Sequence, residues 1–186
     1  MFSKIGLSQK LSIFLRKHLK DMKLFNRITA LLSFIVLFSC GPTDNRKSFT
    51  DVTEYNDFII DNINLIDQLY VTTLDDKSGR EYCLAQCDSL IIQSEKTIEL
   101  LNGIQPYDGD SSLAMAAKGF CIYMGAIGKK DLPEFINIAL NPNITVDDLP
   151  KMNSEAKKLD ENYEIQMNKI ETIQKALSKK FNYTVK

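Results

Sequence analysis

The stretch PKMNSEAKKLDENYEIQMNKIETIQKALSKKF, residues 150–181, decides the fold, because one apolar stripe runs along its whole length. The stripe returns every three or four residues, at Met152, Ala156, Leu159, Tyr163, Met167, Ile170, Ile173, Leu177 and Phe181. This spacing predicts a single amphipathic helix that begins near Pro150. About 30 residues make a rod of about 45 Å, and a rod of that length needs partners of similar length.

Two segments upstream supply such partners. Residues 50–74 follow the potential cap Thr50-Asp51 and carry a stripe at Val52, Tyr55, Ile59, Ile63, Ile66 and Tyr70. Residues 79–103 carry a second stripe at Cys83, Cys87, Leu90, Ser94, Ile98 and Leu101. Residues 75–79 and 103–110 interrupt the periodicity with glycine, proline and charge, so we predict one helix in each segment. Asn102-Gly103 suits a helix C-terminus.

A third helix is predicted over residues 111–127, and it differs in kind from the others. It carries only one charge, Lys118, and is apolar nearly all round, which is typical of a buried helix. Its small residues would let neighbouring helices approach closely: Ala114, Ala116, Ala117, Gly119 and Gly125. Gly128-Lys129-Lys130 is expected to end it, with a flexible residue and cations suited to a helix C-terminus. A short helix should follow from Pro133 to the turn at 141–143.

Short connections favour antiparallel neighbours. The sequence therefore predicts an all-α fold, an up-down-up-down four-helix bundle with a short extra helix between the third and fourth long helices.

Ahead of these helices lies the run ITALLSFIVLFSC, residues 28–40. It is too short to cross about 30 Å of hydrocarbon. Lys23 and Arg27 precede it, and a basic segment followed by a short apolar run is typical of an export signal. The run ends in Leu37-Phe38-Ser39-Cys40, which resembles the lipobox of bacterial lipoproteins. The resemblance implies that Cys40 is the lipidation site, with a diacylglyceryl group on its sulfur, cleavage before it and acylation of its new amino group.

The lipobox also divides the chain. We predict a leader and signal peptide at residues 1–39, with the true start at Met22, a lipidated tether at residues 40–49 and a helical bundle domain at residues 50–186. The resemblance implies a place in the bacterial cell envelope, on the periplasmic or surface face of a membrane. Gly41 stands where an aspartate retains some lipoproteins in the inner membrane, which favours the outer membrane.

Charge and composition exclude several functions. Seven of the 23 basic residues but only one of the 24 acidic residues precede Cys40, so the remainder has a net charge near −7. A surface of that sign repels phosphate backbones, so no nucleic-acid partner is predicted. The single histidine, His18, is lost with the leader. Nucleophiles activated by histidine, histidine zinc sites and Glu-x-x-His di-iron sites are therefore excluded. We predict no catalytic residues, no cofactor and no metal site.

Three cysteines remain after the leader, at positions 83, 87 and 121. Cys83 and Cys87 are four residues apart, where Cβ atoms on a helix lie about 5–6 Å apart. A disulfide needs about 3.5–4.5 Å, so a bond between these two would strain the helix. Both thiols lie on the apolar stripe and fit as core residues, because free cysteine behaves as a small hydrophobe. A disulfide from one of them to Cys121, and copper or redox chemistry, are the alternatives left open.

The stretch DGDSS, residues 108–112, resembles the opening of a calcium-binding loop. Leu113 stands where such a loop needs glycine, so we interpret the stretch as a helix cap formed by Asp110 or Ser111. A set of methionine and aromatic residues can either fill the core or line a cavity between helices: Met115, Phe120, Tyr123, Met124, Met152 and Met167.

The stretch EYNDFIIDNINLIDQLY, residues 54–70, resembles the first helix of uncharacterised helical-bundle lipoproteins and implies no activity. From export and the missing catalytic pattern we predict a non-enzymatic binding or scaffolding module. Acyl chains on Cys40 would hold it at the membrane, with another envelope protein as its partner. The alternative is a carrier of a small apolar molecule in the bundle interior. A weaker alternative is a thiol-based redox or metal-binding protein.

Overall fold

The computed structural model describes residues 44–75 and 78–184. The predicted leader, Met22 and the lipidation site Cys40 lie outside the described residues. The chain divides into two units, Met1–Asn45 and Arg46–Lys186. All helices described below belong to the second unit.

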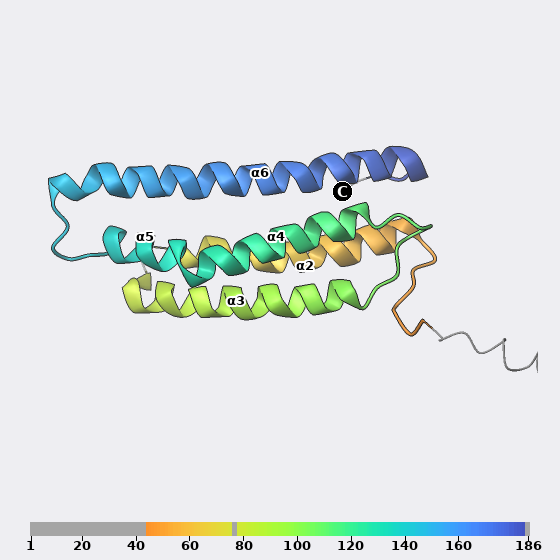
Figure 1. The fold of residues 1–186 in the computed structure, drawn as a ribbon, viewed down its shortest axis with the longest axis horizontal. Coiled ribbons are helices and arrows are strands. Elements are labelled where there is room, and N and C mark those ends of the chain that lie inside the picture. The colour runs from red at the N-terminus through yellow and green to blue at the C-terminus, as the bar shows by residue number, and fades with distance from the viewer. Residues whose placement is uncertain (1–43, 76–77, 185–186) are drawn as a thin grey trace, which may run out of the picture. The chain divides into compact units, whose positions relative to one another are not determined.

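An all-α fold is confirmed (Figure 1). The described helices are α2 (Val52–Thr73), α3 (Arg80–Asn102), α4 (Ser112–Lys129), α5 (Asp131–Ala139) and α6 (Leu149–Phe181), with a 3₁₀ turn η2 (Val146–Asp148) before α6. Within the described residues there are no strands, only isolated bridges at Lys47–Ile104 and Tyr107–Asp110. None of the helices in that part of the chain is long and apolar enough to cross a membrane.

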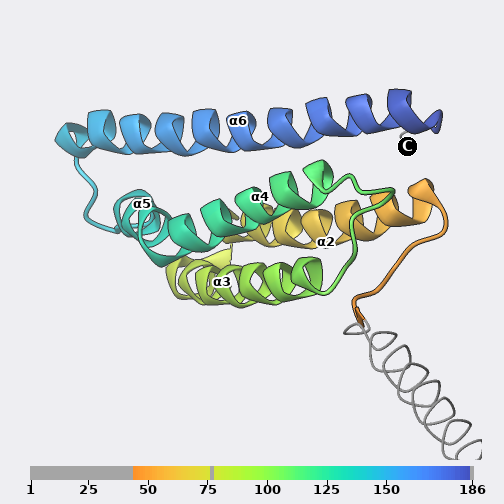
Figure 2. The same ribbon diagram turned by 45° about the vertical axis from the view of Figure 1, so that its right-hand side comes forward.

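Helices α2, α3 and α4 pack against one another and hold most of the core. Both views show α2 and α4 running in one direction, while α3 and α6 run in the other (Figures 1 and 2). The predicted stripe of α2 is buried at every position, and its N-terminus is capped by Asp51, whose Oδ1 accepts from Thr53 N at 2.5 Å. In α3, Thr97 is buried, and Ile98, predicted in the stripe, is only half-buried.

Helix α6 covers α4 and α5. Only Leu159, Ile170 and Leu177 of its long stripe are buried, and the others are partly exposed. Side chains also join α6 and the segment after it to α2: Gln174 Nε2 donates to Asn56 Oδ1 at 2.9 Å, and Tyr183 OH donates to the same oxygen at 3.1 Å. Farther along, the rings of Tyr70 and Tyr163 stack with centroids 5.0 Å apart. The helix therefore lies over the core and fills little of it.

Helix α4 corrects one prediction and agrees with another. It is not buried all round, because Met115 and Ile122 are 65% and 62% exposed. It ends at Lys129, within the predicted terminus at residues 128–130. Gly128 is also the point of closest approach to α3. A Cβ atom built there would lie 3.1 Å from Ile91 Cγ1 and 3.4 Å from the Cys87 carbonyl oxygen. The missing side chain is what allows α3 and α4 to pack this closely.

The α3–α4 loop closes the end of the bundle where the chain enters it. Lys47 N donates to the Gly103 carbonyl at 2.7 Å, and Gln105 N donates to the Lys47 carbonyl at 2.8 Å. The Lys47 ammonium lies 4.2 Å from the ring centroid of Phe58. Part of the predicted tether thus packs on the bundle. Gly103 has φ −83, so the α3 C-terminus does not use a left-handed residue.

Asp110 caps α4, as the DGDSS stretch predicts. Its Oδ1 accepts from Ser112 N at 3.0 Å and from Ser112 Oγ at 2.6 Å, while Oδ2 accepts from Lys180 Nζ at 2.7 Å. Ser111 precedes the helix but makes no side-chain cap bond. Asp110 therefore connects the α3–α4 loop to the end of α6.

No cluster of His, Cys, Asp and Glu suited to a metal occurs in the part of the chain that the structure describes.

Replacing Asp110 by asparagine is expected to lower the free energy of unfolding by about 1 kcal/mol at pH 7. The hydrogen bond from Lys180, and then those from Ser112, lower the pKa of Asp110 to about 2. A depressed pKa contributes stability above the unfolded value of about 4, and this contribution is lost as the pH falls toward 2. Urea denaturation of both proteins at several pH values checks this. A difference that stays constant down to pH 2 would contradict it.

The second unit contains its own hydrophobic core. Every buried apolar residue of the described chain, from Val52 to Leu177, falls within residues 46–186. The interhelix contacts described above join parts of this same unit. Residues 46–186 are therefore a folding unit that can be studied by itself.

Candidate functional site: an apolar pocket at the α5 end

A pocket of about 300 Å³ opens where the end of α2, the start of α3, α5 and the start of α6 meet. This end lies opposite the α3–α4 loop (Figure 1). The pocket is lined by Thr73, Leu74, Cys83, Phe135, Ile136, Ala139, Leu140 and Met152. Four segments far apart in the sequence contribute to it, so no single sequence motif predicts it.

The polar side chains that line this α5-end pocket are directed toward the protein. Thr73 Oγ1 donates to the Leu69 carbonyl at 2.7 Å, and Cys83 Sγ donates to the Asp75 carbonyl at 3.3 Å. The remaining lining side chains are hydrocarbon or thioether. Such a surface offers an occupant dispersion and burial of apolar area, and little directional recognition.

Exposed apolar side chains gather around the same end. Six of the twelve large exposed ones belong to the segments that meet here: Val71, Leu74, Tyr82, Ile144, Val146 and Leu149. Val146, in the turn before α6, is 80% exposed. Single exposed apolar residues need no explanation, but a concentration of them marks interaction sites on monomeric proteins. Of these six residues, Leu74 also lines the α5-end pocket.

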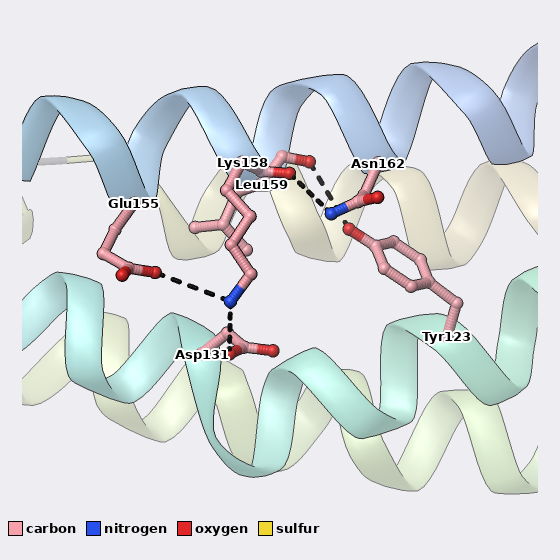
Figure 3. A network of polar contacts seen from close by, with 6 residues as sticks. All are labelled: Tyr123, Asp131, Glu155, Lys158, Leu159 and Asn162. Atoms are coloured by element: carbon pink, nitrogen blue, oxygen red, sulfur yellow. Dashed lines mark hydrogen bonds and ion pairs between the residues drawn. The ribbon is translucent and has the colours of Figure 1, made fainter.

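Polar contacts hold α6 beside α5 (Figure 3). Lys158 Nζ lies 3.4 Å from Asp131 Oδ1 and 3.7 Å from Glu155 Oε2, and Tyr123 OH donates to the Leu159 carbonyl at 3.4 Å. The nearby Asn162 amide donates to the Lys158 carbonyl at 2.9 Å. Exposed ion pairs of this kind contribute about 0–1 kcal/mol each. Helix α6 is therefore held at this end by weak contacts and few buried side chains.

Helix α5 is also connected to α3, through Arg80. Its guanidinium donates through Nε to Asn137 Oδ1 at 2.8 Å, and through Nη2 to the same oxygen. Leu132 and Ile136 are the buried residues of α5. Because α5 has only nine residues, its position depends on these contacts with its neighbours.

All three described cysteines are buried, and none forms a disulfide. Burial raises the pKa of Cys87 to about 11 and that of Cys121 to about 12. A neutral thiol is a poor nucleophile and metal ligand. Cys83 is the only one of the three that lines the α5-end pocket, and Cys121 lies on the far side of the core, beside α3. The three thiols therefore fit the hypothesis that they are core residues.

We expect the three thiols in residues 46–186 to resist Ellman's reagent in the native protein at pH 8. Burial keeps all three thiols inaccessible, and the raised pKa values also keep Cys87 and Cys121 neutral, so reaction should require the helices to open. The raised pKa values of Cys87 and Cys121 also predict a pH dependence of the free energy of unfolding. Their contribution is fully present below the unfolded pKa of about 9 and is lost as the pH rises toward 11. The rates at which Ellman's reagent reacts with the native and the urea-unfolded protein check this expectation. One thiol reacting natively as fast as a small-molecule thiol would reopen the redox hypothesis.

The methionine and aromatic residues identified in the sequence differ in their positions and burial. Met152 lines the α5-end pocket, Phe120 and Met124 are core, and Met115 lies exposed on α4. Phe135, Ala139 and Leu140 were missed as site residues. The available signal was the strongly apolar face of a helix too short to be a bundle member.

Comparison of the chain with family models, with curated proteins and with solved structures gives no match.

Proposed function

We propose that this protein is a lipid-anchored lipoprotein of the bacterial cell envelope, and that it is a non-enzymatic binding module. Acyl chains on Cys40 would hold it at a membrane, by preference the outer membrane, while the α5-end pocket receives an apolar element of another envelope protein. The observation that supports this most is an apolar pocket at the end of the helices where half of the large exposed apolar residues of the described chain also occur.

We further propose that α2, α3, α4 and α6 act as an up-down-up-down four-helix bundle, with α5 as the short extra helix. The alternating directions of the long helices and the contacts of Asn56 with Gln174 and Tyr183 support this. In this arrangement α5 covers one end of the bundle only incompletely. The binding pocket is then the place where the bundle is left open.

The point where the chain enters the bundle supports a partner rather than the membrane as the occupant. Lys47 pairs with the α3–α4 loop, at the end opposite α5. Lys47 is seven positions after Cys40, and an extended chain of that length reaches at most about 25 Å. A lipid on Cys40 would therefore keep the α3–α4 loop near the membrane and leave the α5-end pocket farther from it.

The uncharged apolar fluorophore N-phenyl-1-naphthylamine tests the pocket. Its fluorescence should rise on binding to residues 46–186. Replacing Ala139 by leucine adds a side chain to the pocket lining and should weaken binding at least tenfold. The matched change Ala176→Leu, on the exposed face of α6, should leave binding unchanged. Equal binding by the Ala139 variant and the unmodified protein would remove the pocket from the proposal.

A carrier of a small apolar molecule is the second candidate. A volume of about 300 Å³ lies at the lower limit of pockets that hold small molecules. Native mass spectrometry of the protein from its own envelope distinguishes the two. A retained small molecule of constant mass supports the carrier, and its absence together with a bound envelope protein supports the binding module.

A further inference from the structure

Helix α6 is the longest α-helix of the described chain, and it buries the fewest side chains for its length. Of its 33 residues only Leu159, Ile170 and Leu177 are buried, whereas α4 buries nine residues in a length of 18. Burial of apolar area is the main term that holds one helix against another. Helix α6 is therefore held with much less of it than α4.

Polar side chains supply several of the other contacts of α6. Tyr163 OH donates to Asp67 Oδ1 of α2, and Lys180 Nζ donates to Asp110 Oδ2 of the α3–α4 loop at 2.7 Å. When two surfaces separate, such bonds are exchanged for hydrogen bonds to water, so their net contribution is modest. These contacts fix where α6 lies more than they hold it in place.

Asn56 places a polar group on the surface that α6 covers. Its side chain is 3% exposed, and its Oδ1 accepts from Gln174 Nε2 at 2.9 Å and from Tyr183 OH at 3.1 Å. A buried amide needs hydrogen-bond partners, and water can replace both donors when α6 moves away. This part of α2 is thus suited to a covered and to an uncovered state.

The seam between α2 and α6 is incompletely packed. A hollow of about 250 Å³ lies along it, and half of the side chains that line it are polar, among them Asn64 of α2 and Asn168, Glu171 and Gln174 of α6. A space that is this roomy and this polar can hold water. Water can therefore enter the seam before α6 has moved.

The segment that joins α5 to α6 is suited to bend. Residues 141–147 are all exposed. Their turns are closed by near neighbours in the chain: Asn143 N donates to Asn141 Oδ1 at 2.9 Å, and Thr145 N donates to Asp148 Oδ2 at 3.0 Å. A change of direction here would leave the buried contacts of the preceding helices in place.

The preceding helices keep most of the core when α6 is set aside. Eleven of the twelve largest fully buried side chains lie on α2, α3, α4 and α5, and the twelfth is Leu177 of α6. Helix α3 lies on the side of the unit away from α6 (Figures 1 and 2). The packing of α2, α3 and α4 against one another therefore does not depend on α6.

We propose that α6 is a lid, which separates from the other helices as one unit, with residues 141–147 as its hinge, while α2, α3, α4 and α5 stay packed. Opening uncovers the surface on which Tyr70 and Phe120 contact Tyr163, and it removes Met152 from the wall of the α5-end pocket. The closed form keeps an apolar surface of α2 and α4 covered, and the open form is a minor state in equilibrium with it. This inference does not depend on the function proposed above.

Native-state hydrogen exchange of ¹⁵N-labelled residues 46–186, in low concentrations of urea, tests the lid. A helix released from its neighbours is only marginally stable in water, so opening exposes its amides to exchange. We expect the amides of Leu159, Ile170 and Leu177 to exchange about 100-fold faster than those of Ile59 and Met124. The three α6 amides should also share one dependence on urea, because one opening exposes all of them.

Two substitutions outside α6 distinguish opening of the lid from unfolding of the whole unit. Leu90 is fully buried on α3, so Leu90→Ala destabilises the closed and the open form equally relative to the unfolded chain. It should speed exchange at Met124 about tenfold or more and leave exchange at Ile170 unchanged.

Gly119→Ala has the opposite sign and keeps the test available where Leu90→Ala fails to fold. Its added Cβ meets no atom within 4 Å, so it stabilises α4 in the closed and the open form alike. It should slow exchange at Met124 about threefold, again without a change at Ile170.

The lid is overturned if the α6 amides exchange as slowly as those of Ile59 and Met124. It is also overturned if protection declines gradually toward the ends of α6, because fraying and not a single opening would then expose the amides. A third contradictory result is that Leu90→Ala or Gly119→Ala changes exchange at Ile170 and Met124 by the same factor. In that case α6 opens only when the whole unit unfolds.

Discussion

Replacing Phe120 by alanine is expected to lower the free energy of unfolding of residues 46–186 by about 3–5 kcal/mol. Phe120 is fully buried on α4, and its ring lies edge-on to Tyr163 of α6 with centroids 6.2 Å apart. It thus joins the three-helix core to the covering helix. Truncation removes the apolar area that Phe120 buries and leaves a cavity, because the surrounding helices can close over it only in part.

Urea denaturation followed by circular dichroism measures this change. Met115→Ala is the matched control, since it truncates a large side chain on the same helix that is 65% exposed. That variant should change stability by no more than about 0.5 kcal/mol. A loss of less than about 1 kcal/mol for Phe120→Ala would show that α4 is not at the centre of the core.

The second large effect is expected at Gly128, where leucine should destabilise the unit by about 2–3 kcal/mol. Its first added carbon would lie 3.1 Å from Ile91 Cγ1 and 3.4 Å from the Cys87 carbonyl oxygen. The isoleucine can adjust, but the carbonyl belongs to the backbone of α3. Accommodating leucine therefore requires α3 and α4 to separate, which weakens packing along both helices.

Gly119 provides the control for Gly128, because it lies in the same helix with no atom within 4 Å of its built Cβ. Gly119→Ala should stabilise the unit by about 0.5–1 kcal/mol, since alanine loses less conformational freedom than glycine in a helix. The two substitutions should thus have opposite signs in thermal unfolding. A stabilising Gly128→Leu would contradict the close approach of α3 and α4.

Some features of the fold could be predicted from the sequence. The stripe of α2 is buried at every predicted position, because three-four periodicity over twenty residues defines one face without knowledge of its neighbours. The cap at Asp110 was also predictable, since it depends on residues adjacent in the chain. Features that depend on local sequence spacing could therefore be predicted.

Features that depend on which helix lies next to which were not predictable. Ile122 and Met115 are exposed because no described helix covers that face of α4, and composition alone suggested a buried helix. Gly128 was predicted only as part of a helix terminus, since its close approach to Ile91 depends on another helix. The α5-end pocket combines Leu74, Phe135 and Met152, whose proximity is a property of the fold.

The most direct test of the account is mass spectrometry of the mature N-terminus of this protein isolated from bacterial membranes. We expect the mature chain to begin at Cys40, with a diacylglyceryl group on its sulfur and an acyl group on its nitrogen. The Cys40→Ser variant should be neither lipidated nor cleaved before residue 40. A chain recovered from the soluble fraction with residues 22–39 still attached and Cys40 unmodified would contradict the account.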